Sequence, residues 1–225
     1  MIHSTGMSKN VVIVDYGAGN IRSVARAVAH VDGAPVVSAD PDDIDRAEAL
    51  ILPGVGAAAD TMENLRSRNV IGPVMEYIAA GRPFLGVCMG LQALLDWSEE
   101  NGGTDCLGVL PGKILRFSSE GRKVPHMGWN TVEWTREHAI TEGIPSGSAF
   151  YFVHSYHPTV DDPALALGMT EYGVTFPSAV GRDNVVATQF HPEKSGETGL
   201  RLYSNFLTWA RSAAFVSVAG AGTTT

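Results

Sequence analysis

Short apolar runs alternate with helix-like stripes along the first hundred residues. The apolar runs occupy residues 11–14, 49–52 and 83–87, and continuous runs of this kind are typical of strands buried on both faces of a parallel sheet. Apolar residues at helical spacing begin at Ile21, Ile71 and Leu91. This alternation predicts βαβ units, with a parallel sheet covered by helices on both faces.

The second half of the chain has a different pattern. Strand-like runs recur around residues 149–153, 165–169, 174–180 and 185–190, and residues 181–184 (GRDN) between the last two indicate a turn. These runs predict antiparallel additions to the parallel core. A last helix is expected from apolar residues that share one face: Leu200, Tyr203, Phe206, Leu207 and Ala210. Together the patterns predict a three-layer α/β domain with a mixed sheet.

The length and charge of the chain limit the number of domains and the kinds of partner that it can have. The 225 residues suit one α/β domain, expected over residues 11–212, with a flexible extension at 1–10 and a flexible tail at 213–225. The 24 acidic and 16 basic residues give a net charge of −8, which argues against binding to nucleic acid or to anionic membranes. Because no apolar run approaches about 20 residues and the start lacks a signal-peptide pattern, we expect a cytoplasmic protein.

The first candidate for chemistry is residues 86–90 (GVCMG), between an apolar run and a Leu-rich helix. This is the G-x-Nuc-x-G pattern of a nucleophile elbow, with Cys88 as the nucleophile. At a helix N-terminus the thiolate is favoured, and the Met89 N–H points to where an oxyanion would form. The alternative is a buried cysteine at a tight junction. Cys106 matches no motif and is expected to be structural.

A cysteine nucleophile needs a base, and His191 is the best placed of the seven histidines. It ends the last apolar run, and Glu193, two residues further, can orient the imidazole as the third member of a triad. On its own the His-Pro-Glu triplet is more often an ordinary turn. The order in the chain, with the cysteine about a hundred residues before this triplet, favours the catalytic interpretation.

Two glycine-rich loops follow the first apolar runs. Residues 52–56 (LPGVG) allow the Val55 or Gly56 amide to approach a ligand as a second oxyanion donor, although a plain turn is the alternative. Residues 15–20 (DYGAGN) resemble a dinucleotide fingerprint, but Arg22 stands where the third glycine is required. Asn20 is therefore interpreted as a helix N-cap, and we expect neither a cofactor nor a metal.

These motifs resemble a known family. Residues 52–56, 86–92 and 191–193 are similar to the triad (class I) glutamine amidotransferases. Residues 15–20, 125–130 (PHMGWN), 151–156 (YFVHSY) and 194–195 further resemble the glutaminase subunits of imidazole glycerol phosphate synthases. The similarity runs from about residue 11 to residue 209. One departure is the run 57–59 (AAA), where the family usually has an aromatic residue near 58.

The resemblance implies a flavodoxin-like sheet and a glutamine amidotransferase type 1 domain over residues 11–212. Cys88 would attack the glutamine amide, His191 would transfer the proton and Glu193 would orient His191. The Met89 amide with that of Val55 or Gly56 would hold the oxyanion, and the substrate would be bound by Gln92, Ser155 and Tyr156. Ammonia would pass to a (β/α)₈ cyclase subunit in a heterodimer of histidine biosynthesis. The implied interface consists of Pro125, Met127, Trp129, Asn130 and Lys194.

Three other functions stay open at this point. The chain could serve another synthase, such as those for anthranilate, aminodeoxychorismate or pyridoxal phosphate. It could be a related cysteine peptidase or esterase, or a regulatory subunit with an inactive elbow. A further hypothesis is that the middle amide of the Gly-Val-Gly loop at 54–56 gates activity, because it can point either way.

Overall fold

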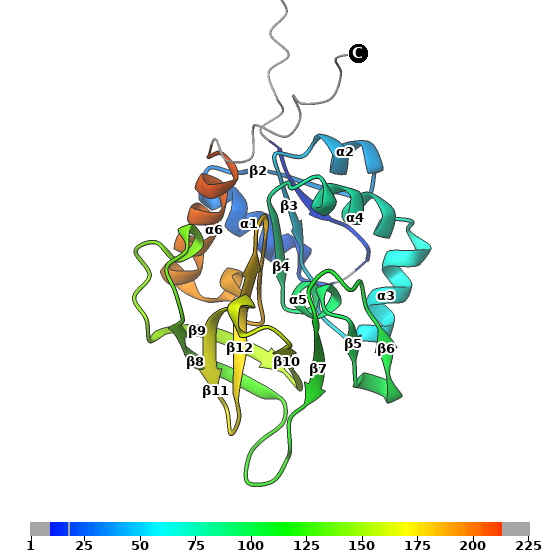
Figure 1. The fold of residues 1–225 in the computed structure, drawn as a ribbon. Coiled ribbons are helices and arrows are strands. Elements are labelled where there is room, and N and C mark those ends of the chain that lie inside the picture. The colour runs from blue at the N-terminus through cyan, green and yellow to red at the C-terminus, as the bar shows by residue number, and fades with distance from the viewer. Residues whose placement is uncertain (1–9, 18, 213–225) are drawn as a thin grey trace, which may run out of the picture.

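The structure of the protein is a computed structural model that describes residues 10–17 and 19–212 (Figure 1). The predicted flexible tail at 213–225 and residues 1–9 of the predicted extension lie outside the described residues. Asn10, placed at the end of that extension, is instead the first residue of a strand.

The main sheet has nine strands in the order β2-β1-β3-β4-β13-β12-β11-β8-β9. The first five strands in this order run parallel, and the other four continue the sheet antiparallel. The strands are β1 (Asn10–Val14), β2 (Ala34–Ser38), β3 (Ala49–Leu52), β4 (Phe84–Val87), β8 (His126–Trp134), β9 (Ser148–His154), β11 (Ala166–Glu171), β12 (Thr175–Arg182) and β13 (Val185–Thr188).

Helices cover both faces of the parallel strands. The helices and short 3₁₀ turns are α1 (Ile21–His30), α2 (Pro41–Arg46), α3 (Ala58–Ser67), α4 (Ile71–Ala79), α5 (Met89–Leu94), α6 (Gly196–Ala210), η1 (Glu100–Gly102), η2 (Ala139–Thr141), η3 (Pro163–Leu165) and η4 (Pro192–Lys194). Val11 and Ile13 of β1 share one apolar core with α1 and α6, whereas Val12 and Val14 share the other with α2–α5. Figure 1 shows these two helical layers on opposite sides of the sheet. The predicted three-layer, flavodoxin-like fold is confirmed.

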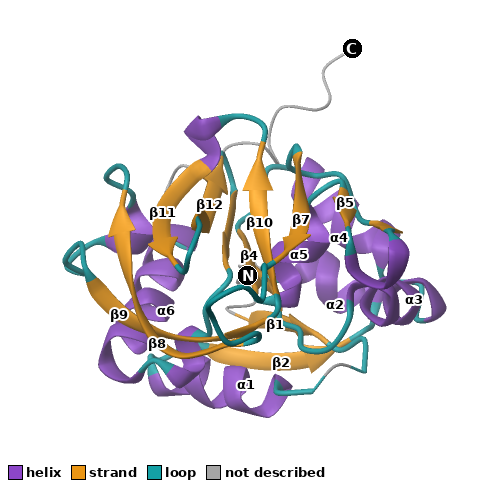
Figure 2. Ribbon diagram, turned by 90° about the horizontal axis from the view of Figure 1, so that it is seen from below, coloured by secondary structure: helices purple, strands orange, loops and turns teal. Residues whose placement is uncertain are grey.

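A smaller second sheet was not predicted strand by strand. It has the order β10-β7-β5-β6, and its strands are β10 (Tyr156–Val160), β7 (Gly112–Arg116), β5 (Trp97–Ser98) and β6 (Thr104–Asp105). Figure 2 shows β10, β7 and β5 in succession beside the α5 side of the main sheet. Two of these strands have only two residues each, too few to show an alternating pattern.

The last apolar run was predicted as an antiparallel addition to the sheet, but one of its two pairings is parallel. It forms β13, which pairs parallel to β4 in the register Thr188↔Val87 and antiparallel to β12. The predicted turn at 181–184 is shorter, because Gly181 and Arg182 still belong to β12. This insertion of β13 beside β4 brings the residues that follow both strands to one end of the sheet.

Of the helices in the described chain, none is long and apolar enough to cross a bilayer.

Candidate active site

Cys88 occupies a sharp turn between β4 and α5, as the elbow motif predicts. Its backbone has φ 55° and ψ −104°, a strained conformation for a residue with a side chain. The neighbouring glycines make the turn possible. A Cβ on Gly86 would lie 2.8 Å from the Gly90 carbonyl, and one on Gly90 would lie 1.8 Å from the Leu52 oxygen. Only residues without a side chain fit at these two positions.

Backbone hydrogen bonds hold Cys88 in place. Its N–H donates to the Thr188 oxygen of β13 at 2.7 Å, and its own oxygen accepts from the amides of Leu91 and Gln92 in α5. The residue is 4% exposed, so the thiol meets solvent only through the pocket described below. Cys106, which has no role in this site, is half-buried, and burial raises the pKa of its thiol to about 11. At neutral pH it is a poor nucleophile.

His191 and Glu193 form the second part of the site. Their side chains are buried, and His191 Nδ1 lies 2.7 Å from Glu193 Oε1. Asn20 also donates from Nδ2 to Glu193 Oε1. The other imidazole nitrogen, Nε2, has no hydrogen-bond partner among the described residues, which leaves it available for proton transfer. Burial lowers the pKa of His191, but the interactions with the adjacent Cys88 and with Glu193 outweigh burial and raise it.

The turn that carries the base is fixed by the neighbouring edge strand. The His191 N–H donates to the Tyr151 oxygen of β9 at 2.9 Å. Ser195 Oγ donates to the His191 oxygen at 2.6 Å and accepts from the Tyr151 N–H at 3.0 Å. The three predicted triad residues are thus brought together by the β4–β13 pairing and by the contact of η4 with β9.

A pocket of about 410 Å³ opens at Cys88. Its lining contains every residue predicted for the oxyanion hole and for glutamine, together with two of the predicted interface residues. These residues are Val55, Gly56, Met89, Gln92, Ser155, Tyr156, Pro125 and Lys194. The pocket is large enough for an amino-acid amide, and it joins the nucleophile to the predicted partner surface.

The loop 53–56, which was predicted to supply an oxyanion donor, is closely packed on its Pro53 side. Tyr16 donates from its hydroxyl to the Pro53 oxygen at 2.8 Å, and a Cβ on Gly54 would lie 2.2 Å from that hydroxyl oxygen and 2.6 Å from Met89 Cβ. Gly56 is different: its φ of 104° favours glycine, and a Cβ there would meet no atom of the described chain within 4 Å. The loop is therefore anchored at its start by Tyr16, while Gly56 supplies the positive φ at its end.

Two residues of the site were missed by sequence reasoning. Gln189, fully buried on the pocket side, donates to Cys88 Sγ at 3.6 Å and accepts from Gln92 Nε2 at 3.0 Å. Asn20 does stand at the N-cap of α1, but its side chain makes no capping bond there and reaches Glu193 instead. Both contacts join residues at least 97 positions apart, so local pattern carries no signal for them.

The predicted interface residues divide between two faces of β8. Met127 and Trp129 are 62% and 60% exposed. The Trp129 ring packs edge-on against the Tyr151 ring, with 6.2 Å between their centroids, and Lys194 Nζ lies 5.7 Å from the centroid of the same ring. Asn130 lies on the opposite face, where its side chain donates to the Glu171 oxygen at 2.9 Å. The exposed part of the predicted surface is therefore Pro125, Met127, Trp129 and Lys194.

Behind the pocket, a chain of hydrogen bonds links two histidines. His154 Nδ1 lies 2.7 Å from the Tyr156 oxygen, so it must donate, which makes its Nε2 the acceptor for His126 Nδ1 at 2.9 Å. Asn130 Nδ2 then donates to His126 Nε2 at 3.2 Å. Burial lowers the pKa of His126 to about 4 and that of His154 to about 3, so both rings are neutral.

Across the described ranges, no group of His, Cys, Asp and Glu side chains is arranged to hold a metal.

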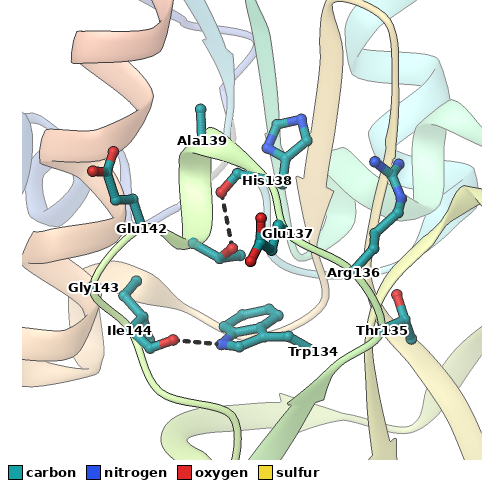
Figure 3. Close-up of a pocket in the computed structure, with 10 residues that line it drawn as sticks. Trp134, Thr135, Arg136, Glu137, His138, Ala139, Glu142, Gly143 and Ile144 are labelled. Atoms are coloured by element: carbon teal, nitrogen blue, oxygen red, sulfur yellow. Dashed lines mark hydrogen bonds between the residues drawn. The ribbon is translucent and has the colours of Figure 1, made fainter.

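A second hollow lies away from the triad (Figure 3). Its volume is about 790 Å³, and its lining runs from Trp134 to Ile144. Two of its polar side chains bond within the segment, since Trp134 Nε1 donates to the Ile144 oxygen at 3.0 Å and Thr141 Oγ1 to the His138 oxygen at 2.9 Å. Two others, Thr135 and Arg136, donate to backbone oxygens of neighbouring strands. None of the residues predicted for chemistry lines it.

Comparison with known proteins agrees with the geometry. The family described as glutamine amidotransferase class-I matches residues 12–209. The imidazole glycerol phosphate synthase subunit HisH of Herpetosiphon aurantiacus is 49% identical over 202 residues, covering 90% of this chain and 95% of the relative. The subunit of the same name from Nitrosococcus oceani is 48% identical, covering 89% and 97%.

Solved structures show the same fold at low identity. The structure of PurLQS from Thermotoga maritima has a TM-score of 0.71 at 20% identity, covering 90% of this chain and 99% of that one. A crystal structure titled glutamine amidotransferase has a TM-score of 0.68 at 22% identity, covering 91% and 99%. The chain therefore belongs to the class-I glutamine amidotransferase family and is a glutamine-hydrolysing enzyme of the imidazole glycerol phosphate synthase glutaminase type.

Proposed function

We propose that Cys88, His191 and Glu193 form the catalytic triad of this glutaminase. The observation that supports the proposal best is the combination of a strained Cys88 with a neighbouring imidazole whose other nitrogen is bonded to a buried carboxylate. This is the nucleophile, base and orienting group of a triad. A structural cysteine has no need of the strained backbone or of the oriented histidine.

The reaction follows from these positions. The Cys88 thiolate attacks the side-chain amide carbon of glutamine, and the C–N bond then breaks as His191 Nε2 gives its proton to the leaving ammonia. The developing oxyanion accepts hydrogen bonds from the Met89 N–H and from Val55 or Gly56. Water, deprotonated by His191, hydrolyses the glutamyl thioester and releases glutamate. Glu193 stabilises the imidazolium in both halves of the reaction.

Substrate binding is assigned to the walls of the pocket. Gln92, Ser155 and Tyr156 line it, and we propose that they hold the amino-acid end of L-glutamine. Gln189 supports Gln92 from behind through its 3.0 Å hydrogen bond. With the amino-acid end of glutamine held by these residues, its side-chain amide would face Cys88.

The exposed residues beside the pocket are proposed as the docking surface of a (β/α)₈ cyclase subunit. Pro125 and Lys194 line the pocket mouth, and Met127 and Trp129 extend the surface outward. Ammonia released at Cys88 would pass directly to that partner, which would make imidazole glycerol phosphate and an aminoimidazole carboxamide ribotide in histidine biosynthesis. A cytoplasmic heterodimer without nucleic acid or membrane partners is proposed on the same basis.

The experiment that tests the triad and the partner together is glutamate release from glutamine. The purified chain is assayed alone, then with a cyclase subunit and its ribonucleotide substrate, and Cys88→Ala serves as the control. Strong activation that disappears in Cys88→Ala supports both parts of the proposal. Labelling of Cys88 by a glutamine-like electrophile without activation by that partner contradicts the proposed partner and retains the triad.

A further inference from the structure

One buried hydroxyl near the triad has no role in the proposed mechanism. Tyr203 of α6 is fully buried in the core that also contains Cys88. Its hydroxyl has no hydrogen-bond partner in the described chain. A buried phenol normally finds a partner, because leaving it unpaired loses the hydrogen bonds that water would supply.

The only other unpartnered polar atoms of this kind in the described ranges belong to the triad itself, His191 Nε2 and Glu193 Oε2. The donors to Glu193, from His191 and Asn20, both reach Oε1. A carboxylate accepts on both oxygens, so Oε2 is a buried charged acceptor that still needs a donor.

The packing of α6 brings Tyr203 to the same place. Gly199 lies so close to the turn η4 that a Cβ on it would stand 1.8 Å from the Pro192 oxygen. Tyr203 follows one helical turn later and therefore shares this face of α6. Burial, and after it the nearby Glu193 carboxylate, raises the pKa of Tyr203 well above its usual range, so the hydroxyl keeps its proton. Toward a carboxylate, which can only accept, it is the donor.

We propose that Tyr203 is a positioning residue for the triad, whose hydroxyl donates to Glu193 Oε2. Asn20 and His191 then hold one carboxylate oxygen and Tyr203 holds the other, which fixes the plane of the carboxylate against the imidazole. The inference rests on the proposed role of Glu193. It assigns to α6, a helix that does not line the pocket, an effect on the rate of the chemical step.

The test is Tyr203→Phe in the full chain, assayed in complex with the cyclase subunit. The variant keeps the ring and removes only the donor. We expect kcat for glutamine to fall about three- to tenfold, as for the loss of one hydrogen bond, with KM unchanged. The NMR resonance of the His191 Nδ1 proton, which reports on its bond to Glu193, should move as well.

The matched control is Tyr77→Phe, because Tyr77 is a second buried phenol, on α4 rather than beside the triad. It should change neither kcat nor the His191 resonance. The proposal is overturned if Tyr203→Phe leaves kcat and the resonance unchanged, or if kcat falls while the resonance stays in place. If the wild-type complex shows no glutamate release that depends on Cys88, it is the triad proposal that fails instead.

Discussion

The elbow at residues 86–90 and the wall formed by β8, β9 and η4 hold their parts of the site by different means. In the elbow, backbone sterics decide the geometry, since Gly86 and Gly90 admit no side chain and Cys88 is bonded through its main chain. In the wall, polar side chains decide it, through Glu193 with Asn20 and through His126 with His154. The elbow should therefore respond sharply to an added methyl group, and the wall to a lost hydrogen bond or a gained charge.

The largest effect is expected from Gly90→Ala. The new Cβ would stand 1.8 Å from the backbone oxygen of Leu52, and because both sides of the clash are main chain, the elbow must open. We expect glutaminase activity to be lost and the free energy of unfolding to fall by about 3 kcal/mol or more. Activity and chemical denaturation measure the two effects.

Gly72→Ala is the control for that variant. Gly72 lies in α4, and a Cβ there would meet nothing in the described chain within 4 Å. Because Gly72 lies in the first turn of α4 and precedes Pro73, the added methyl should change the free energy of unfolding by less than about 1 kcal/mol and leave activity unchanged. Equal tolerance of alanine at positions 72 and 90 would contradict the steric account of the elbow.

The next largest effect is expected in the wall, from Glu193→Gln. The amide has the shape of the carboxylate but loses the charge that stabilises the imidazolium, so kcat should fall about 100-fold or more. Steady-state kinetics of the partner complex measure it. Glu197→Gln, an exposed change in the first turn of α6, should leave kcat as it is, and a similar loss in both variants would argue against a role for Glu193 in the triad.

A smaller effect is expected on the outer surface of the wall. Trp129→Ala removes a 60% exposed side chain, which contributes little to the stability of the free subunit. An aromatic residue of this kind at the centre of an interface is worth about 2 kcal/mol, or roughly a 30-fold change in affinity for the cyclase subunit. Calorimetric titration measures that affinity.

Val37→Ala is the control for the interface variant, because Val37 is a 44% exposed residue of β2, at the opposite edge of the main sheet. It should bind the cyclase subunit as the wild type does. Unchanged affinity in Trp129→Ala would remove this residue from the docking surface.

The smallest effect, taken per pH unit and per histidine, is a dependence of the free energy of unfolding on pH. Burial lowers the pKa of His126 and His154, so the unfolded chain takes up protons below about pH 6.5 that the folded chain refuses. The contribution of these two histidines is complete above that pH and falls as the pH drops toward 4, by about 1 kcal/mol per pH unit for each histidine. Urea unfolding at pH 7, 6 and 5 gives the slope.

His126→Gln should make the slope of the free energy of unfolding against pH shallower. The control is His30→Gln, an exposed change at the end of α1, which should leave the slope as it is. A slope that is equal in both variants would show that the histidine pair is not its source.

The difference between the elbow and the wall also explains which features could be predicted from the sequence. Glycines that exclude a Cβ leave a local pattern, so the sharp turn at residues 86–90 was predicted correctly. The alternating strands and helices of the first half were also predicted from local pattern. Gln189 and Asn20 were missed as site residues because their partners lie far along the chain. The small second sheet was missed because β5 and β6 have two residues each. Strand alternation alone places Asn130 on the other face of β8 from Met127 and Trp129. Which of the two faces is exposed could be told only from the position of β8 in the sheet.

The place of β13 in the sheet has a consequence for biosynthesis. Cys88 follows β4, but its backbone partner Thr188 and the proposed base His191 arrive about a hundred residues later, with the strand β13 that pairs beside β4 in parallel. Contacts of such long sequence separation form late and slowly. A nascent chain released from the ribosome as far as residue 150 thus carries the thiol without the histidine. If Cys88 and His191 act as proposed, glutaminase activity, and with it free ammonia, can begin only after residue 191 has left the ribosome and β13 has paired with β4.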